Sequence, residues 1–470
     1  MTLGNYEKKG KIKNFKITKL FGKKNVNLNF EEGIKIFVGE NGIGKTTILN
    51  VIYYTLKLRF KELKEIEFDS IQMEIYGSEK VVIYRDWLLH DEEYIELDRY
   101  FNRLQRYLTS DELDFLQIRI IENKEKTPKD FNEMFRDEII RRGVPYDMIY
   151  REIRIISRNA ENMKFSKAIS KARNIIKNEI SENIMYFPTY RRIEEDLKKL
   201  GYITPHESDL YKVAPKKVRE IPNINGELIQ FGMDDVQDSI DRITDEIRNS
   251  SIVGYSQITG KMITHLVHEN KANNTMKDIV KKAESLNIVL DRVGDYLSVH
   301  DKNTIRNLIA SNEIFDSEQT NYDPLIYFLY NLIQLYEKQS DKDNAIKNFR
   351  NACNQFLVDK EVFYDESSVK ISILNKNAEK VELRNLSSGE KQIVSLFSKI
   401  YLDSSNDFLI LFDEPELSLS IEWQEKLLPE VISSDKCNFM MVVTHSPFIY
   451  SNNLRDFAES IEGCIEEVQI

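Results

Sequence analysis

The sequence predicts an α/β protein with a mixed sheet and a phosphate-loop core, interrupted by a large and mainly α-helical insertion. Two observations predict the α/β part. A strand, a glycine loop and a helix follow one another near residue 40, and a second group of apolar strands follows residue 360. Most of the chain between them has helical periodicity. We therefore expect three segments, at 1–90, 91–360 and 361–470, with the first and last forming one head.

The composition is that of a globular protein with more than one domain. The 470 residues are 41% hydrophobic and 30% charged, and their number exceeds what one compact core accommodates. No apolar run approaches the ~20 residues that cross a bilayer, and the N-terminus lacks an apolar signal core. Cys353, Cys437 and Cys464 show no metal-ligand spacing, so we expect a cytoplasmic protein without a membrane partner. The net charge of −11 argues against a protein that coats nucleic acid, although it allows a local basic groove.

Two hairpins are expected before and after the phosphate loop. Residues 11–30 alternate apolar and polar side chains around Gly22, which predicts an antiparallel hairpin. The stretches Ile71–Ile75 and Val81–Ile83 predict a second one. The lysines within Lys8–Lys24 could reach nucleotide or DNA phosphates, but a solvated strand face accounts for most of them.

The stretch from Ile34 to Thr47, IKIFVGENGIGKTT, has the spacing G-x-x-x-x-G-K-T between a strand and a helix. Its glycines let backbone N–H groups converge on phosphate oxygens, and the helix N-terminus adds a positive dipole. Lys45 would reach the β- and γ-phosphates, and the Thr46 hydroxyl would ligate Mg²⁺. The residues expected at this nucleotide site are Gly39, Glu40, Asn41, Gly42, Ile43, Gly44, Lys45, Thr46 and Thr47.

The insertion is expected to consist mostly of helices. Helical patterns extend over residues 91–180, from Met233 onward, and over 276–297, 303–310 and 322–359. A short buried strand at Ile184–Phe187 interrupts them and ends at Pro188. Residues 201–226 are rich in turn residues and are interpreted as a loop. No heptad run is long enough for an extended coiled coil, which favours a compact or modestly protruding helical domain.

Strands resume at Val369–Leu374 and Val381–Leu383, and a motif that could contact an anion follows them. The sequence Ser387-Ser388-Gly389-Glu390 opens a helix, in which a serine can cap the N-terminus. Gly389 would let the backbone approach a phosphate. Taken alone, this pattern is equally well explained as an ordinary helix cap.

Two further strands end in polar residues that suit phosphate chemistry. The apolar run Phe408–Phe412 ends in Asp413 and Glu414, as a central parallel strand would. Asp413 is placed to hold Mg²⁺, and Glu414 to polarise the attacking water. The strand Met441–Thr444 ends in His445, which could contact a γ-phosphate. We assign Glu414 and His445 as the candidate catalytic residues, and Thr46 and Asp413 as the metal ligands.

Together these motifs resemble those of the ABC-type ATPases, which include the SMC, RecF and OLD proteins. Gly39–Thr46 looks like a Walker A loop and Leu386–Gln392 like the ABC signature. Phe408–Glu414 looks like Walker B, and His445 like the switch histidine. The resemblance implies an ABC-type ATPase head that binds ATP with Mg²⁺ and hydrolyses it slowly.

The resemblance also implies an oligomer. In that family, the signature of one subunit closes over ATP held by the Walker A loop of another. We therefore expect a homodimer or higher oligomer with an ATP sandwich, in which Ser388 and Gly389 act in trans. The signature residues expected near nucleotide are Ser387, Ser388, Gly389 and Glu390.

Finer features resemble the OLD-like ATPases of prokaryotes. These features are the sequences DEPELSLS at 413–420 and THSPFI at 444–449. Tyr186–Glu194 occupies the position of the Q-loop but has no obvious glutamine. Arg191 and Arg192 there are candidates for phosphate or partner contact, and equally for surface ion pairs.

Only about 20 residues follow the THSPFI sequence, and they leave no room for the Toprim nuclease domain of OLD nucleases. The motif set resembles stand-alone AAA family ATPases of anti-phage systems such as PARIS, Septu and some retrons. The expected function is a nucleotide-gated sensor or scaffold in antiviral defence. It would hold a separate effector, such as a nuclease or toxin, until a phage component triggers it.

Two alternatives remain open. A DNA-clamping ATPase related to RecF or SMC proteins would need a basic groove and salt-dependent DNA affinity. An intrinsic nuclease would need a cluster of acidic metal ligands, and the sequence offers none outside the nucleotide site. His265 and His268 lie at i and i+3 of an expected helix, where packing or surface roles explain them better than metal binding.

Overall fold

The computed structural model describes residues 10–30, 33–40, 42–89, 104, 107–109, 112–113, 115–116, 119, 126–142, 144–158, 160–188, 233–268, 271–316, 322–403 and 407–468. The predictions for Asn41, for residues 189–194 of the Q-loop-like segment, which include Arg191 and Arg192, and for the loop at 201–226 lie outside these residues.

The chain divides into two compact units. The first unit consists of Met1–Leu228, Asp407–Glu416 and Cys437–Ile470. The second consists of Ile229–Asn406 and Leu417–Lys436. The boundaries of these units differ from those expected at residues 90 and 360. A division into two units by contacts does not test the three expected segments, which stay a prediction.

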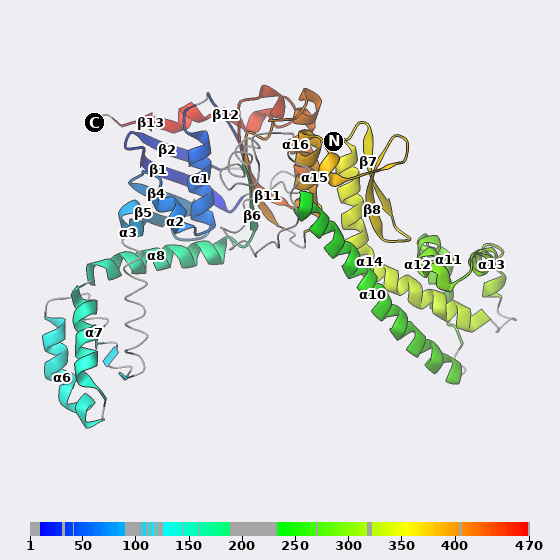
Figure 1. Ribbon diagram of the computed structural model, residues 1–470, viewed down its shortest axis with the longest axis horizontal. Helices are drawn as coiled ribbons and strands as arrows, with labels where there is room; N and C mark the ends of the chain where they lie inside the picture. Colours follow the sequence, from blue (N-terminus) through cyan, green and yellow to red (C-terminus); the bar gives the residue numbers. More distant parts are fainter. Residues whose placement is uncertain are drawn as a thin grey trace, which may run out of the picture. The chain divides into compact units, whose positions relative to one another are not determined.

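The first unit contains an antiparallel and a parallel sheet (Figure 1). The strands of the antiparallel sheet are β1 (Ile12–Leu20), β2 (Lys24–Asn29), β4 (Ser70–Ile75), β5 (Val81–Tyr84) and β13 (Ile465–Glu467). Their order is β13-β2-β1-β4-β5. Both expected hairpins are confirmed, with Phe15 opposite Leu28 in the first and Ile71 opposite Ile83 in the second.

The parallel sheet places the ends of its strands at one edge. Its strands are β3 (Ile34–Val38), β6 (Asn183–Phe187), β10 (Phe408–Asp413), β11 (Cys437–Thr444) and β12 (Ala458–Ser460), in the order β12-β3-β11-β10-β6. In register, Asp413 lies beside Val443, and Thr444 lies beside Val38. The residues that follow β3, β10 and β11 therefore meet at the carboxyl edge of this sheet, as the sequence predicts.

One apolar core joins the two sheets of the first unit through a helix. α1 (Lys45–Leu56) contributes Ile48 and Ile52 to a cluster that also contains Phe15 of β1 and Leu411 of β10. The other helices of this unit are α2 (Phe60–Lys64), α3 (Arg85–Leu89), α6 (Thr127–Arg141), α7 (Tyr146–Arg158) and α8 (Ala160–Glu179). α8 adds Ile176 to the same core. The helix that follows the phosphate loop therefore packs in one apolar core with strands of both sheets and with α8.

The last described residues complete both sheets, which the sequence did not predict. β12 pairs with β3 in the parallel sheet, and β13 pairs with β2 in the antiparallel sheet. A short 3-10 turn, η7 (Ile461–Cys464), connects them. Strands of this length and acidity carry too little apolar alternation to be recognised from sequence.

The second unit is built on two long helices. Its elements are α10 (Met233–Val267), α11 (Asn274–Lys282), α12 (Leu286–Arg292), α13 (Val299–Ala310), α14 (Asp323–Asn354), α15 (Ser388–Tyr401), α16 (Ile421–Ser433), and the strands β7 (Lys360–Asp365), β8 (Lys370–Asn375) and β9 (Lys380–Val381). α10 and α14 pack along each other, and both also contact α15 (Figure 1). α11 and α12 also pack against α14.

Two expectations for this unit were wrong in detail. The single helix expected over 276–297 is divided, because Ala283 adopts an extended conformation with ψ 105° and ends α11. The helix expected to reach residue 359 ends at Asn354. The strand β7 follows it and buries Val362 and Tyr364, and its strand pattern was overlooked. Among the described residues, no helix is both long enough and apolar enough to cross a membrane.

Candidate functional site

The loop between β3 and α1 has the backbone of an anion-binding turn. Gly42 and Gly44 have φ angles of +88° and +105°, in the region that glycine enters without strain. α1 begins directly after Gly44, and its fully described first turn carries no acidic side chain. The N-terminal dipole of α1 favours a bound anion at the loop. Thr47 also lies in this first turn, and Ile43 lies in the turn between the two glycines.

Lys45 is buried under the loop, with only 5% of its surface exposed. Its Nζ donates to the carbonyl oxygens of Gly39 at 2.8 Å and Glu40 at 3.0 Å. Burial lowers the pKa of Lys45, and the carboxylates of Glu414 and Asp413 oppose this shift. Because carbonyl oxygens are weaker acceptors than phosphate oxygens, this ammonium can pass to a phosphate at little cost.

Thr46 and Asp413 form an oxygen pair suited to a divalent cation. The Thr46 hydroxyl donates to Asp413 Oδ1 at 3.1 Å, although the two residues are far apart in sequence. Tyr186 donates its phenolic hydroxyl to the other oxygen, Oδ2, at 3.4 Å. Asp413 is 1% exposed. Hydroxyl and carboxylate oxygens are the ligands that Mg²⁺ prefers, so the residues present fit this ion.

Glu414 and His445 face each other beside Lys45. Glu414 Oε1 lies 3.2 Å from His445 Nε2, and the same nitrogen lies 2.5 Å from Lys45 Nζ. One ring nitrogen can donate to the carboxylate or accept from the ammonium, but it cannot do both. Glu414 also has a φ of +51°, held by the hydrogen bond from its N–H to the Val443 carbonyl at 2.9 Å. Strained backbone of this kind is typical of functional positions.

Glu416 fixes the segment that carries His445. Its Oε1 accepts hydrogen bonds from the Thr444 hydroxyl at 2.8 Å, the His445 N–H at 2.8 Å and the Ser446 N–H at 3.2 Å. Only 8% of Glu416 is exposed. Buried carboxylates are retained where several donors satisfy them, so Glu416 positions the histidine through its backbone. Sequence reasoning missed this role, because it treated Glu416 only as part of a family motif.

An aromatic side chain lies beside the phosphate loop and was also missed. Phe21 is in the β1–β2 turn, is 44% exposed and has a φ of +53°. A Cβ at Gly44 would stand 3.5 Å from the Phe21 ring. Lys24, on the next strand, donates to the Ile43 carbonyl at 3.2 Å. An exposed ring next to an anion site offers a stacking surface for a base, and its signal in the sequence is an apolar residue in a hairpin turn.

Other lysines of the N-terminal hairpin have protein partners. Lys11 pairs with Glu182 at 3.2 Å, and Lys19 pairs with Asp69 at 2.7 Å. These contacts agree with the interpretation of the lysines as side chains on a strand face.

The signature residues lie in the second unit, at the start of α15. Ser387 caps the helix, because its hydroxyl accepts from the Glu390 N–H at 3.4 Å and its own N–H donates to Glu390 Oε2 at 2.8 Å. A Cβ at Gly389 would stand 2.5 Å from the Ser418 carbonyl oxygen, so this position requires glycine. Ser388 is exposed at the helix N-terminus.

Glu390 has partners within its own unit. Lys360 donates to its two carboxylate oxygens at 2.8 and 3.1 Å. Burial alone would raise the pKa of Glu390, but the hydrogen bonds from Lys360 and Ser387 outweigh it and hold this pKa below its usual value. These contacts give Glu390 a structural role in the cap, and its expected contact with nucleotide stays a prediction.

The structure thus brings the phosphate loop, Asp413, Glu414 and His445 together, whereas Ser387–Glu390 belong to the second unit. In the described part of the chain, no group of three or more histidine, cysteine, aspartate or glutamate side chains is arranged to hold a metal ion. His265 is buried in α10 and His268 is exposed.

Comparison with known proteins gives a family and distant structural likenesses. Residues 8–450 match the family model described as AAA ATPase domain. Similar solved structures include an Smc head bound to the C-winged helix domain of ScpA, at 11% identity, with a TM-score of 0.33 and coverage of 98% of each chain. They also include an Smc head with an extended coiled coil bound to the C-terminal domain of ScpA from Pyrococcus furiosus, at 12% identity, a TM-score of 0.34, and 97% and 96% coverage of this chain and that one. A third is the Smc head with a coiled coil and joint from Pyrococcus yayanosii, at 14% identity, a TM-score of 0.31, and 98% and 97% coverage. No curated protein matches the chain.

Proposed function

This chain belongs to the AAA ATPase domain family, and on that premise we propose that it binds ATP with Mg²⁺ at the carboxyl edge of its parallel sheet and hydrolyses it slowly as a switch. One observation carries the proposal. The buried Lys45, the Thr46–Asp413 oxygen pair and Glu414 all meet at this edge, although they come from distant segments.

The loop and α1 would hold the triphosphate. The N–H groups around Gly42 and Gly44 and the start of α1 would donate to its oxygens, and Lys45 would exchange its carbonyl partners for phosphate oxygens. Thr46 and Asp413 would hold the metal. Mg²⁺–ATP, when bound, supplies the phosphoryl group to be transferred and a cation that draws negative charge from it.

Glu414 would act as the general base that orients the attacking water. Its carboxylate lies within hydrogen-bond reach of His445, which would leave Lys45 for a phosphate oxygen when nucleotide enters. Glu416 would keep His445 in place during this exchange.

We test nucleotide binding with Lys45→Ala, which should abolish ATP binding measured by equilibrium dialysis. Lys64→Ala, on α2 of the same unit, is the control and should bind ATP like the wild type. Unchanged ATP binding by Lys45→Ala would refute the site.

The second part of the proposal is an ATP-sandwich dimer in which Ser388 of one subunit reaches the triphosphate on another. Its support is that Ser388 is exposed in the first turn of α15, beside the Ser387–Glu390 capping box. Ser388→Arg should retain ATP binding but lose hydrolysis, and Lys45→Ala should lose both.

Mixing these two inactive variants separates contact in trans from contact in cis. If subunits exchange, mixed dimers contain one intact composite site, so hydrolysis should return to roughly a quarter of the wild-type rate. A mixture that stays inactive, although native mass spectrometry shows mixed dimers, would contradict contact in trans.

The third part is that the ATPase controls a separate effector in anti-phage defence. Its support is the DEPELSLS and THSPFI sequences. The test is a plaque assay in cells that carry this gene and its neighbouring reading frames. Protection should disappear with Lys45→Ala, and equal protection by wild type and variant would refute the role of the ATPase.

A further inference from the structure

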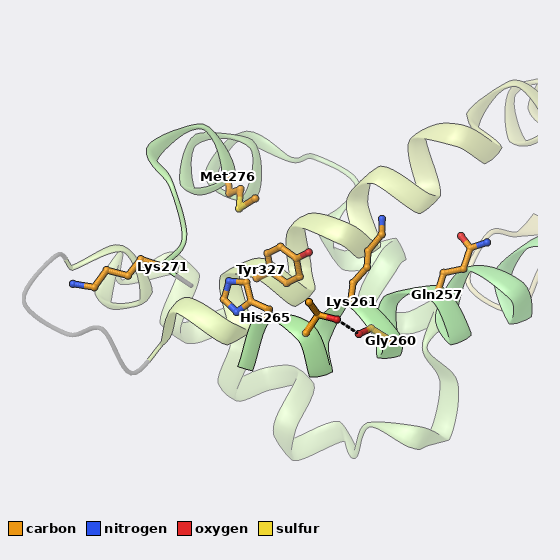
Figure 2. Close-up of a pocket in the computed structure, with 8 residues that line it drawn as sticks. Gln257, Gly260, Lys261, His265, Lys271, Met276 and Tyr327 are labelled. Carbon is orange, nitrogen blue, oxygen red and sulfur yellow. Dashed lines mark hydrogen bonds between the residues drawn. The ribbon is translucent and has the colours of Figure 1, made fainter. Parts of the chain in front are cut away.

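The second unit contains a pocket of about 670 Å³ between α10, α11 and α14, whose polar side chains do not converge (Figure 2). His265 stacks on Tyr327, with the ring centroids 4.1 Å apart. Lys261 and Lys271 lie on opposite sides of this pair and point away from it (Figure 2). A ligand site needs a few polar groups aimed at one point, so we assign this pocket no ligand. In the first unit, by contrast, two hydroxyl groups converge on the carboxylate of Asp413.

Each oxygen of the Asp413 carboxylate accepts from a different element. Oδ1 accepts from the Thr46 hydroxyl of α1 at 3.1 Å, and Oδ2 accepts from the phenolic hydroxyl of Tyr186 on β6 at 3.4 Å. Asp413 is 1% exposed and Tyr186 is 2% exposed, so both groups are shielded from water. Thr46 is one of the proposed metal ligands, but Tyr186 is not. Its hydrogen bond to Oδ2 therefore calls for a separate explanation.

The position of Tyr186 follows from the register of the parallel sheet. β6 lies beside β10, and Tyr186 is next to Leu411. Alternate residues of a strand share a face, so Leu411 and Asp413 point to the same side of β10. Tyr186 lies on that side too, because neighbouring strands in register share their faces. From there its long side chain reaches the carboxylate at the end of β10.

α1 fixes the ring of this tyrosine. It carries Thr46 at its start and Tyr53 two turns later, on the same face of the helix. The ring of Tyr53 packs against that of Tyr186, with the centroids 5.0 Å apart and an interplanar angle of 35°. Tyr53 is fully buried. The helix that supplies the donor to Oδ1 therefore also positions the donor to Oδ2.

The next residue of β6 shows what packing alone requires. Phe187 points to the other face of the sheet, where its ring stacks on Phe412 with the centroids 4.9 Å apart. It is 3% exposed, so both aromatic residues of β6 are buried. A phenylalanine serves packing at one position, whereas Tyr186 adds a hydroxyl that needs a partner in a buried site. This contrast indicates that the Tyr186 hydroxyl serves the carboxylate rather than the core.

We propose that Tyr186 is a positioning residue that makes the metal site selective for Mg²⁺ over Ca²⁺. The inference rests on the proposed function, because it takes Asp413 as a ligand of the metal that accompanies ATP. By holding Oδ2, Tyr186 leaves Oδ1 as the carboxylate oxygen beside the Thr46 hydroxyl. Mg²⁺ requires a compact octahedral shell at about 2.1 Å, whereas Ca²⁺ accepts both oxygens of a carboxylate at about 2.4 Å. A carboxylate that offers one oxygen therefore disfavours Ca²⁺.

The test is ATP binding by the full chain, measured by equilibrium dialysis while MgCl₂ or CaCl₂ is titrated at a fixed ATP concentration. The ratio of the two half-saturating cation concentrations gives the preference, and the wild type should prefer Mg²⁺. Tyr186→Phe removes only the hydroxyl and keeps the ring against Tyr53, so it should fold normally, which circular dichroism checks. It should reduce the preference for Mg²⁺ by about tenfold, the usual effect of losing a residue that orients a metal ligand.

The matched control is Tyr364→Phe, which removes the hydrogen bond from another buried tyrosine to an aspartate, Asp343 of the second unit. It should lose thermal stability but keep the wild-type preference for Mg²⁺. The inference is overturned if Tyr186→Phe keeps that preference, or if its ATP binding weakens by the same factor with both cations. In these cases the proposed function still stands, because wild-type binding depends on Mg²⁺ and Lys45→Ala does not bind. Wild-type ATP binding that is independent of Mg²⁺ would overturn the proposed metal site and this inference together.

Discussion

The edge of the parallel sheet and the start of the signature helix are assembled in opposite ways. At the sheet edge, side chains from four distant strands or loops contact one another, as in the pair of Thr46 with Asp413. At the start of α15, the main contacts join Ser387 to Glu390, three residues away. The first arrangement depends on the fold of a whole unit, whereas the second is centred on one helical turn, which Lys360 and the Ser418 carbonyl also contact.

This difference indicates how each region responds to substitution. Polar groups at the sheet edge can be exchanged without removing apolar packing, so their loss should change chemistry more than stability. At the helix start, Glu390 holds the cap and Gly389 lies against the Ser418 carbonyl, so their loss should change stability first. Ser388 is exposed and should behave differently from its neighbours.

Glu414→Gln gives the largest effect and tests the sheet edge as a chemical site. Removing the base should lower kcat by about 100-fold or more while ATP binding persists. Steady-state phosphate release and equilibrium dialysis measure the two quantities. Normal turnover would show that Glu414 is not the base.

Glu416→Gln should lower kcat by about tenfold, because the neutral amide accepts more weakly from the N–H groups of His445 and Ser446. KM for ATP should change little, since Glu416 acts through the position of His445. The exposed Glu65→Gln serves as the control for charge loss in the same unit. If kcat stays normal and only thermal stability falls, Glu416 is purely structural.

Phe21→Ala should raise KM for ATP by about fivefold and leave kcat nearly unchanged, because it removes a stacking surface worth about 1 kcal/mol. Phe21→Tyr retains the ring and should behave like the wild type. The comparison of ATP with tripolyphosphate sharpens the result, since only the ligand with a base should lose affinity. An equal loss for both ligands would assign Phe21 to the shape of the loop.

Glu390→Gln tests the start of α15, and among these four substitutions it should have the smallest effect. The free energy of unfolding of the second unit should fall by about 1 kcal/mol at neutral pH. The pKa of Glu390 is lowered by Lys360 and Ser387, so its ionised form stabilises the fold above the ordinary pKa of glutamate. That stability is lost as the pH falls through the folded value, and wild type and variant should then converge in urea melts. A difference that persists at low pH would contradict the role of the charge.

The sequence predicted the elements whose signals are local. Alternating residues indicated β1, β2, β4 and β5, and a glycine loop before a helix indicated the phosphate site. The apolar runs before Asp413 and His445 also sufficed to place both residues at one sheet edge, because parallel strands share the direction of their ends.

What the sequence did not predict depends on contacts between distant residues. Glu416 acquires its role only when β10 and β11 lie side by side, and Phe21 only when the first hairpin folds beside Gly44. β12 and β13 are too short to show a period, and their strand form comes from the neighbours with which they pair.

The first residue of the nucleotide loop lies against η7, the turn that follows β12 near the end of the described chain. A Cβ on Gly39 would stand 2.6 Å from the Ile461 side chain, so this isoleucine presses directly on the first residue of the loop. More than 400 residues separate the two, and the ribosome must deliver Ile461 before that support exists. In a nascent chain, the contact between Gly39 and Ile461 therefore forms only after residue 461 has been synthesised.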